Sequence, residues 1–146
     1  MFYGEYTHGI DNKSRLIMPS RIREVAKENG VEKFFLTRGL EKCIFMFAEG
    51  EWRLQEQRFK NLSFTKEQAR HFNRLFFSGA VEVVPDRQGR FIIPGYLKEF
   101  AGIKKESIVI GVSNRLEIWE PKAWKEIFSR TSVDYEKTAE GMLDIS

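Results

Sequence analysis

The sequence has very little with which to build a catalytic or metal-binding site. Its 146 residues include one cysteine, Cys43, and two histidines, His8 and His71. A single cysteine excludes an internal disulfide, and its place in an apolar run indicates a buried thiol. Neither histidine has Cys, Asp or Glu near it at metal-ligand spacing. The sequence also lacks a glycine-rich phosphate loop and a nucleophile elbow, so we expect no cofactor, no metal and no enzyme activity.

Long apolar runs and a signal-like N-terminus are also absent, so the sequence predicts a cytoplasmic protein that makes no membrane contact. A chain of 146 residues is one domain by length and buries about two-thirds of its unfolded surface. The net charge is +3, and residues 120–146 carry four basic and six acidic residues, which leaves +5 on the rest. This distribution permits an anionic partner such as nucleic acid without requiring one.

One pattern of residues occurs twice. The segments DNKSR at 11–15 and DRQGR at 86–90 both read as Asp, three polar residues and Arg. Each is followed by three apolar residues and a proline, Pro19 in the first and Pro94 in the second. The offset is 75 for the Asp, the Arg and the Pro alike. A pattern that recurs in register in this way indicates an internal duplication.

The duplication extends well beyond these turns. The apolar run 44–47 matches 116–119, and Trp52 matches Trp124, both at an offset of 72. One unit of about fifty residues is therefore used twice, which is too few copies for a stacked array. We predict a single domain over 1–146 in which two halves complete one core. Its parts are expected at 2–52 (first repeat), 53–79 (connecting helices), 80–124 (second repeat) and 125–146 (C-terminal helix and tail).

Apolar periodicity and turn signals predict the same order of elements in each repeat. The order is strand, turn, strand, helix, two strands and helix. The first repeat is expected to place them at 2–10, 11–14, 15–18, 20–28, 34–37, 43–47 and 49–59. The second is expected to place them at 81–85, 86–89, 90–93, 94–101, 108–112, 116–119 and 121–128.

The remaining segments are a connector and a tail. A helix is predicted over 65–77, with Thr65 and Gln68 as a capping box and an apolar stripe along one face. The residues of that stripe are Ala69, Phe72, Leu75 and Phe76. The charged segment 132–146, with Met142, Leu143 and Ile145 near its end, is expected to be a loosely attached tail.

Each repeat alone offers too few strands to close a core. We therefore predict an α+β fold in which the two repeats pair through their strands into a small intertwined β-barrel with flanking helices. Pseudo-two-fold symmetry would bring the two Asp-x-x-x-Arg turns close together on one side.

The turns themselves offer two kinds of residue. Asp11 and Asp86 stand where a carboxylate accepts hydrogen bonds from backbone N–H groups just ahead of it, so we expect them to brace the turns. Carboxylates repel phosphate, which makes direct DNA contact by these two residues a poor interpretation.

The residues between Asp and Arg are hydrogen-bonding or cationic, and side chains of these types read base edges and hold phosphates. They are Asn12, Lys13 and Ser14 in the first turn and Arg87 and Gln88 in the second. A two-stranded ribbon fits the major groove of DNA. With Arg15, Arg90, Arg21 and Arg23 behind them, the two tips would form a short basic ridge. The plainer interpretation is that charged residues at turn tips are simply solvated.

These motifs resemble those of the MraZ family of bacterial transcriptional regulators, encoded at the head of the division and cell-wall gene cluster. The resemblance covers residues 2 to about 130 and rests on the duplicated turns, the apolar-Pro steps and the two Trp-containing segments. It implies the double swapped-hairpin barrel shared with the AbrB and SpoVT regulators. It also implies a ring of identical subunits, at the nucleoid, that binds short direct repeats of double-stranded DNA in the promoter of its own operon.

By position, the resemblance implies DNA contact from Lys13, Arg15, Arg87 and Arg90. Gly89 lacks the side chain that Ser14 has, so the two turns need not contribute equally.

Three alternatives remain at this point. A ring-forming structural or protein-interaction module would bind no duplex in a salt-sensitive way. Binding to single-stranded RNA usually uses exposed stacking aromatics, and neither turn has one. A metal-dependent nuclease could use Asp11 and Asp86, but each has a basic neighbour and no carboxylate cluster accompanies them.

Overall fold

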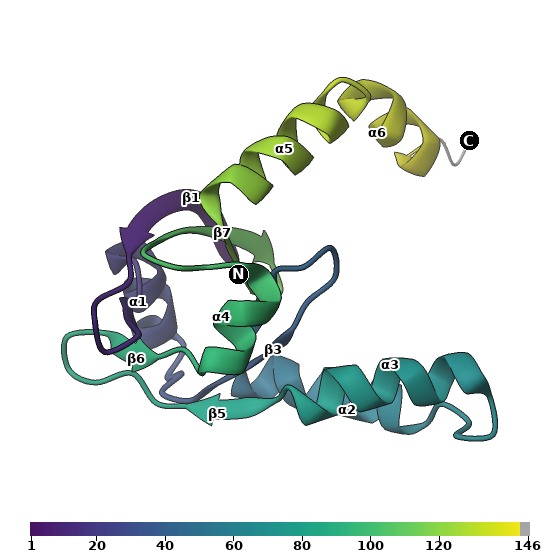
Figure 1. Ribbon diagram of the computed structural model, residues 1–146, viewed down its shortest axis with the longest axis horizontal. Helices are drawn as coiled ribbons and strands as arrows, with labels where there is room; N and C mark the ends of the chain where they lie inside the picture. Colours follow the sequence, from purple (N-terminus) through teal and green to yellow (C-terminus); the bar gives the residue numbers. More distant parts are fainter. Residues whose placement is uncertain (144–146) are drawn as a thin grey trace.

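The computed structural model describes residues 1–143 as a β-rich body from which two helical arms project (Figure 1). The first repeat consists of β1 (Phe2–Gly9), β2 (Arg15–Ile17), α1 (Ser20–Glu28), β3 (Phe34–Arg38), β4 (Ile44–Ala48) and α2 (Glu49–Lys60). Helix α3 (Glu67–Ser78) connects it to the second repeat. That repeat consists of β5 (Val81–Val83), β6 (Arg90–Ile92), α4 (Gly95–Ala101), β7 (Glu106–Ser113), β8 (Leu116–Trp119) and α5 (Pro121–Ser132), followed by α6 (Tyr135–Leu143).

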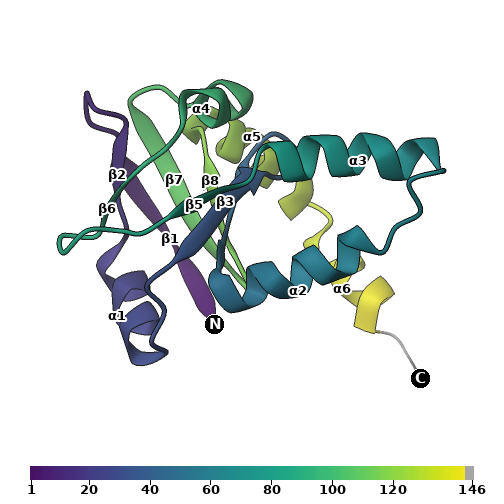
Figure 2. The same ribbon diagram turned by 90° about the horizontal axis from the view of Figure 1, so that it is seen from below.

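The repeats exchange strands, as the sequence predicted. A six-stranded sheet has the order β1-β7-β8-β4-β3-β5, and a two-stranded sheet pairs β2 with β6. All pairs are antiparallel, and four of them, β1 with β7, β5 with β3, β4 with β8 and β2 with β6, join the first repeat to the second. Figure 2 shows β2 and β6 on the side of the body away from α2 and α3. Neither repeat therefore forms a complete sheet without the other.

The prediction of a closed barrel was wrong for residues 1–143. Their strands form two separate hydrogen-bonded sheets. Strands β2 and β6 have three residues each. Each runs towards a proline, Pro19 or Pro94, which has no N–H to continue a ladder. A single bridge between Ile10 and Leu16 joins β2 to the end of β1.

The strand register places equivalent residues of the two repeats opposite each other. Leu16 faces Phe91 across β2 and β6, and these positions differ by 75. Phe45 faces Glu117 across β4 and β8, and these differ by 72. A pseudo-two-fold axis therefore passes through both strand pairs.

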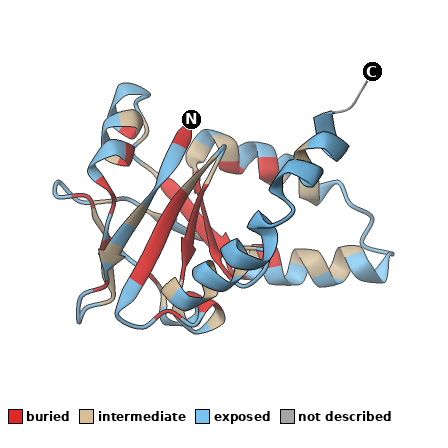
Figure 3. Ribbon diagram, turned by 90° about the horizontal axis from the view of Figure 1, so that it is seen from above, coloured by how far each residue is buried: buried red, intermediate tan, exposed pale blue. Residues whose placement is uncertain are grey.

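Two apolar clusters hold the body together, and Figure 3 shows their buried residues concentrated on the strands. In the first, helices α1 and α4 bury the equivalent residues Ile22 and Leu97. The second lies under α2, α3 and α5 and contains Trp52, Phe76 and Cys43, so the prediction of a buried thiol is confirmed. Full burial of one such aliphatic or aromatic side chain contributes about 1.5–3 kcal/mol.

Helix α3 differs from its prediction at its start and along its stripe. The helix begins at Glu67 behind Lys66, which makes no side-chain cap hydrogen bond. The capping box was therefore wrong, and the Thr65 hydroxyl instead pairs with that of Ser63 at 2.6 Å. Leu75, which was predicted to lie in the buried stripe, is 57% exposed. Only one side of α3 is covered by the rest of the protein, so the buried face of the helix is narrower than predicted.

The C-terminal segment is helical as far as Leu143, in α5 and α6. Glu120 caps α5 by accepting hydrogen bonds from Lys122 N and Ala123 N, each at 2.9 Å. Helix α6 follows because Glu, Lys, Ala, Met and Leu over 135–143 are good helix formers. It buries no residue, and residues 144–146 of the predicted tail, including Ile145, lie outside the described part. None of the helices in residues 1–143 is both long and apolar enough to span a membrane.

Candidate nucleic-acid interface

The two Asp-x-x-x-Arg turns project from the same side of the body, as predicted. They connect β1 to β2 and β5 to β6, and both loops extend on the side opposite the helical arms in Figures 1 and 2. The pairing of β2 with β6 holds them there, because Arg15 lies opposite Ile92 and Ile17 opposite Arg90. The two turns are therefore a fixed pair and not two independent loops.

Each turn is closed by the same set of hydrogen bonds. In the first, one carboxylate oxygen of Asp11 accepts from Lys13 N and Arg15 N, both at 2.9 Å, and the other accepts from Arg15 Nε at 2.8 Å. The backbone N–H of Arg15 is the main cause that lowers the pKa of the Asp11 carboxyl below its ordinary value. The carboxylate is thus directed into its own turn.

The second turn repeats this arrangement. Asp86 accepts from Gln88 N, Arg90 N and Arg90 Nε, all at 2.9 Å. The backbone N–H of Arg90 is again the first cause of the lowered pKa of the Asp86 carboxyl. These are the contacts that bracing of the turns requires, and they engage the Nε of Arg90 as they do that of Arg15.

The backbone of the two turns also matches. Ser14 has φ 62° and Gly89 has φ 80°, so the last residue before the Arg is left-handed in both. Ser14 N donates to Asp11 O at 3.0 Å, and Gly89 N donates to Asp86 O at 2.9 Å. Serine carries a small strain in this conformation that glycine avoids.

Reciprocal backbone hydrogen bonds connect each turn to the other repeat. Met18 N donates to Gly89 O at 2.8 Å, and Ile93 N donates to Ser14 O at 2.9 Å. Donors and acceptors are both related by the offset of 75. The carbonyls just before Arg15 and Arg90 are therefore satisfied from across the pseudo-two-fold axis.

Comparison with known proteins identifies the family that carries this pair of turns. A family model described as "MraZ protein, putative antitoxin-like" matches residues 1–75 and again residues 76–145. The transcriptional regulator MraZ of Moorella thermoacetica is 50% identical over 144 residues, which cover 99% of this chain and 98% of that protein. The chain belongs to the MraZ family. It is therefore a member of a family of transcriptional regulators and not an enzyme.

The double match of the MraZ model agrees with the duplication read from the sequence. It also gives the turns a common setting, since each MraZ repeat supplies one of them. The exposed tip residues are Asn12 and Lys13 in the first repeat and Arg87 and Gln88 in the second. Ser14 is half-buried.

The arginines expected behind the tips differ in their surroundings. Arg21 is exposed on α1, whereas Arg23 is half-buried and donates from a terminal nitrogen to Gln88 O at 2.6 Å. Lys98 was not among the residues predicted from the sequence, yet its Nζ donates to Ser14 Oγ at 3.0 Å. The signal was available, since Arg23 and Lys98 are cations at an offset of 75.

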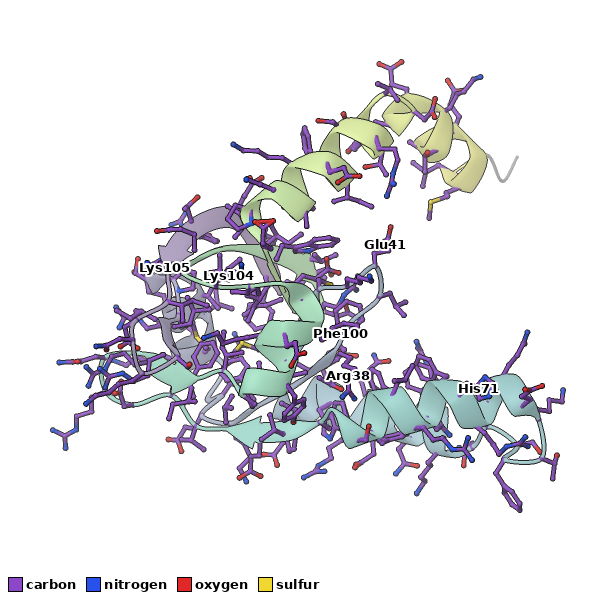
Figure 4. The ribbon with its side chains drawn as sticks, viewed as in Figure 1. Arg38, Glu41, His71, Phe100, Lys104 and Lys105 are labelled. Atoms are coloured by element: carbon purple, nitrogen blue, oxygen red, sulfur yellow. The ribbon has the colours of Figure 1, made fainter. Side chains whose placement is uncertain are left out.

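The candidate groups for catalysis lie apart from the turns. His71 is 60% exposed on α3, where it is 3.6 Å from Glu67 (Figure 4). Burial raises the pKa of the Cys43 thiol above its ordinary value, so this thiol is a poor nucleophile. Among residues 1–143, no three His, Cys, Asp or Glu side chains come together as a metal site.

Proposed function

We propose that this protein regulates transcription by binding double-stranded DNA with its two turns. The observation that carries the proposal is the pairing of two equivalent turns on one side of the body with Lys13 and Arg87 exposed at their tips. Both carboxylates are hydrogen-bonded inside their own turns, so they face the turn backbone and not an approaching phosphate.

The proposed roles follow from the chemistry of each side chain. Lys13 and Arg87 hold phosphates, while Asn12 and Gln88 read base edges in the major groove. Arg15 and Arg90 contribute positive charge behind the tips while they brace the turns. Ser14 contributes less than its exposed neighbours because its hydroxyl already accepts a hydrogen bond from Lys98.

One pair of tips makes few contacts, so we propose that several subunits act together as a ring. The ring binds short direct repeats in the promoter of its own operon, at the nucleoid in the cytoplasm. Successive contacts on one duplex raise affinity through effective concentration. Affinity then depends on the number and spacing of repeats more than on any one of them.

The two helical arms support a head-to-tail ring. Helices α2 and α5 occupy equivalent positions, offset by 72, and α3 packs on α2 through Phe59 and Phe72, whose ring centroids are 4.6 Å apart. Among the described residues, α5 has no such covering helix, because α6 continues away from the body (Figure 1). Phe128 is consequently 53% exposed.

Charge and exposed apolar residues suit a second copy of the chain as the missing partner. Residues 49–78 carry six basic and four acidic residues, +2, whereas residues 120–146 carry −2. The α2–α3 arm also exposes Phe64 at its tip, 78% exposed. We propose that this arm of one subunit packs against α5 and α6 of the next.

The decisive experiment measures binding to a promoter fragment across a salt series. Lys13→Ala/Arg87→Ala is compared with wild type and with Lys42→Ala, which removes a positive charge from the β3–β4 loop, outside the turns and outside both helical arms. We expect the turn variant alone to lose affinity, and the slope of log K against log salt to fall by about 1.8 for two phosphate contacts.

Size-exclusion chromatography with light scattering tests whether the turn variant assembles as wild type does. Unchanged binding by the turn variant would contradict DNA contact at the turns. Equal affinity for one isolated repeat and for the whole promoter fragment would contradict the role of the ring.

A further inference from the structure

Two side chains outside the turns contact the turn pair, and each comes from the helix of the opposite repeat. Arg23 on α1 of the first repeat donates to Gln88 O in the second turn at 2.6 Å. Lys98 on α4 of the second repeat donates to Ser14 Oγ in the first turn at 3.0 Å. The contacts span 65 and 84 positions in sequence, so no single repeat can make them.

The chemistry of each contact matches the residue that the turn presents. A Cβ added to Gly89 would stand 2.4 Å from Arg23 Cδ and 2.9 Å from a terminal nitrogen of Arg23. A side chain at position 89 would therefore displace Arg23 from its present path to Gln88 O. At the equivalent position in the first turn, Ser14 has a hydroxyl, and the cation that contacts it is Lys98. The Lys98 ammonium donates its hydrogen bond to this hydroxyl, which glycine lacks.

We propose that Arg23 and Lys98 are positioning residues that hold the two DNA-contacting turns in a fixed relation, Arg23 paired with Gly89 and Lys98 paired with Ser14. The proposal rests on DNA contact by the turns. One terminal nitrogen of Arg23 and the Nζ of Lys98 each donate to a turn, so these residues act on DNA through the turns. Fixing the tips before binding removes part of the ordering cost that association would otherwise incur.

The test exchanges one pairing for the other without changing any charge. Arg23→Lys and Gly89→Ser are made singly and together, which gives the second turn the lysine and serine of the first. Each single variant is expected to bind the promoter fragment about tenfold more weakly, since one charge-assisted hydrogen bond is lost or blocked. The double variant should return to within about threefold of wild type, because the two changes act on one contact.

NMR relaxation of the backbone amides of residues 86–90 in the DNA-free protein reports on the contact between Arg23 and Gln88 O independently of DNA binding. Both single variants should show increased motion there, and the double variant should return to the wild-type values. Losses in DNA binding that simply add in the double variant, or tips that stay as rigid in Arg23→Lys as in wild type, would overturn the proposal.

The variant Lys98→Met tests the positioning role of Lys98 independently. It should weaken binding while leaving the salt slope unchanged, because the ammonium faces Ser14. A slope reduced by about 0.9 would mean that Lys98 contacts a phosphate itself, which overturns its positioning role. Failure of the proposed function looks different: the salt series of Lys13→Ala/Arg87→Ala would match wild type, while the NMR changes in Arg23→Lys would remain.

Discussion

Arg38 at the end of β3 contacts both α3 and α4. Its removal should therefore weaken the packing of these three elements. From the end of β3, one terminal nitrogen donates to Leu75 O at 2.8 Å and to Ser78 Oγ at 3.1 Å, both on α3. The guanidinium also lies 5.6 Å from the ring of Tyr96 and 5.9 Å from that of Phe100, both on α4 (Figure 4).

We expect Arg38→Ala to lower the free energy of unfolding by about 2 kcal/mol. Hydrogen bonds from charged groups contribute about 1.5–3 kcal/mol when buried, and the half-exposed position of Arg38 places the two bonds together near the low end. The cation–π contacts add about 0.5 kcal/mol. For a domain of this size, the melting temperature should fall by about 4–8 °C.

Differential scanning calorimetry measures this shift, and hydrogen exchange locates it. The amides at the C-terminal end of α3 should exchange faster, while those of the turns should not change, because Arg38 makes no contact with residues 11–15 or 86–90. Arg74→Ala is the matched control, since Arg74 is an exposed arginine on α3 itself. A shift no larger than that of the control would refute the reasoning.

Three further predictions concern the turns, the thiol and the core. The pKa values of Asp11 and Asp86 are lowered in the folded state, so their stabilisation is present above the unfolded value of about 3.9 and is lost as pH falls through the lower folded values; NMR of the turn amides should show no transition above about pH 4.5. Cys43 is fully buried, so Ellman's reagent at pH 8 should modify it only after unfolding in urea, and rapid modification of the native protein would contradict this. Leu16 is 0% exposed and Ile17 is 43% exposed, so urea denaturation should give a loss of about 3 kcal/mol for Leu16→Ala and less than about 1 kcal/mol for Ile17→Ala; equal losses would contradict the burial argument.

The parts of the fold predicted well are those encoded by short-range patterns. The offset of 75 located both turns, and period-two and period-3.6 apolar patterns located the strands and helices. The errors concern ends and surroundings. The capping box at Thr65 failed because the helix starts two residues later, at Glu67, and Leu75 is exposed because nothing in its own periodicity reveals which side of α3 is covered.

The sequence by itself determined the duplication, the chemistry of the two turns and the burial of Cys43. Each depends on residues close together in the chain or related by one constant offset. Only the tertiary structure decided which strands of the two repeats pair, that the strands form two sheets, and that Arg23 and Lys98 reach across to the opposite turns. The physical reason is that these contacts join residues at least 45 positions apart. Their partners are chosen by packing around the pseudo-two-fold axis rather than by local preference.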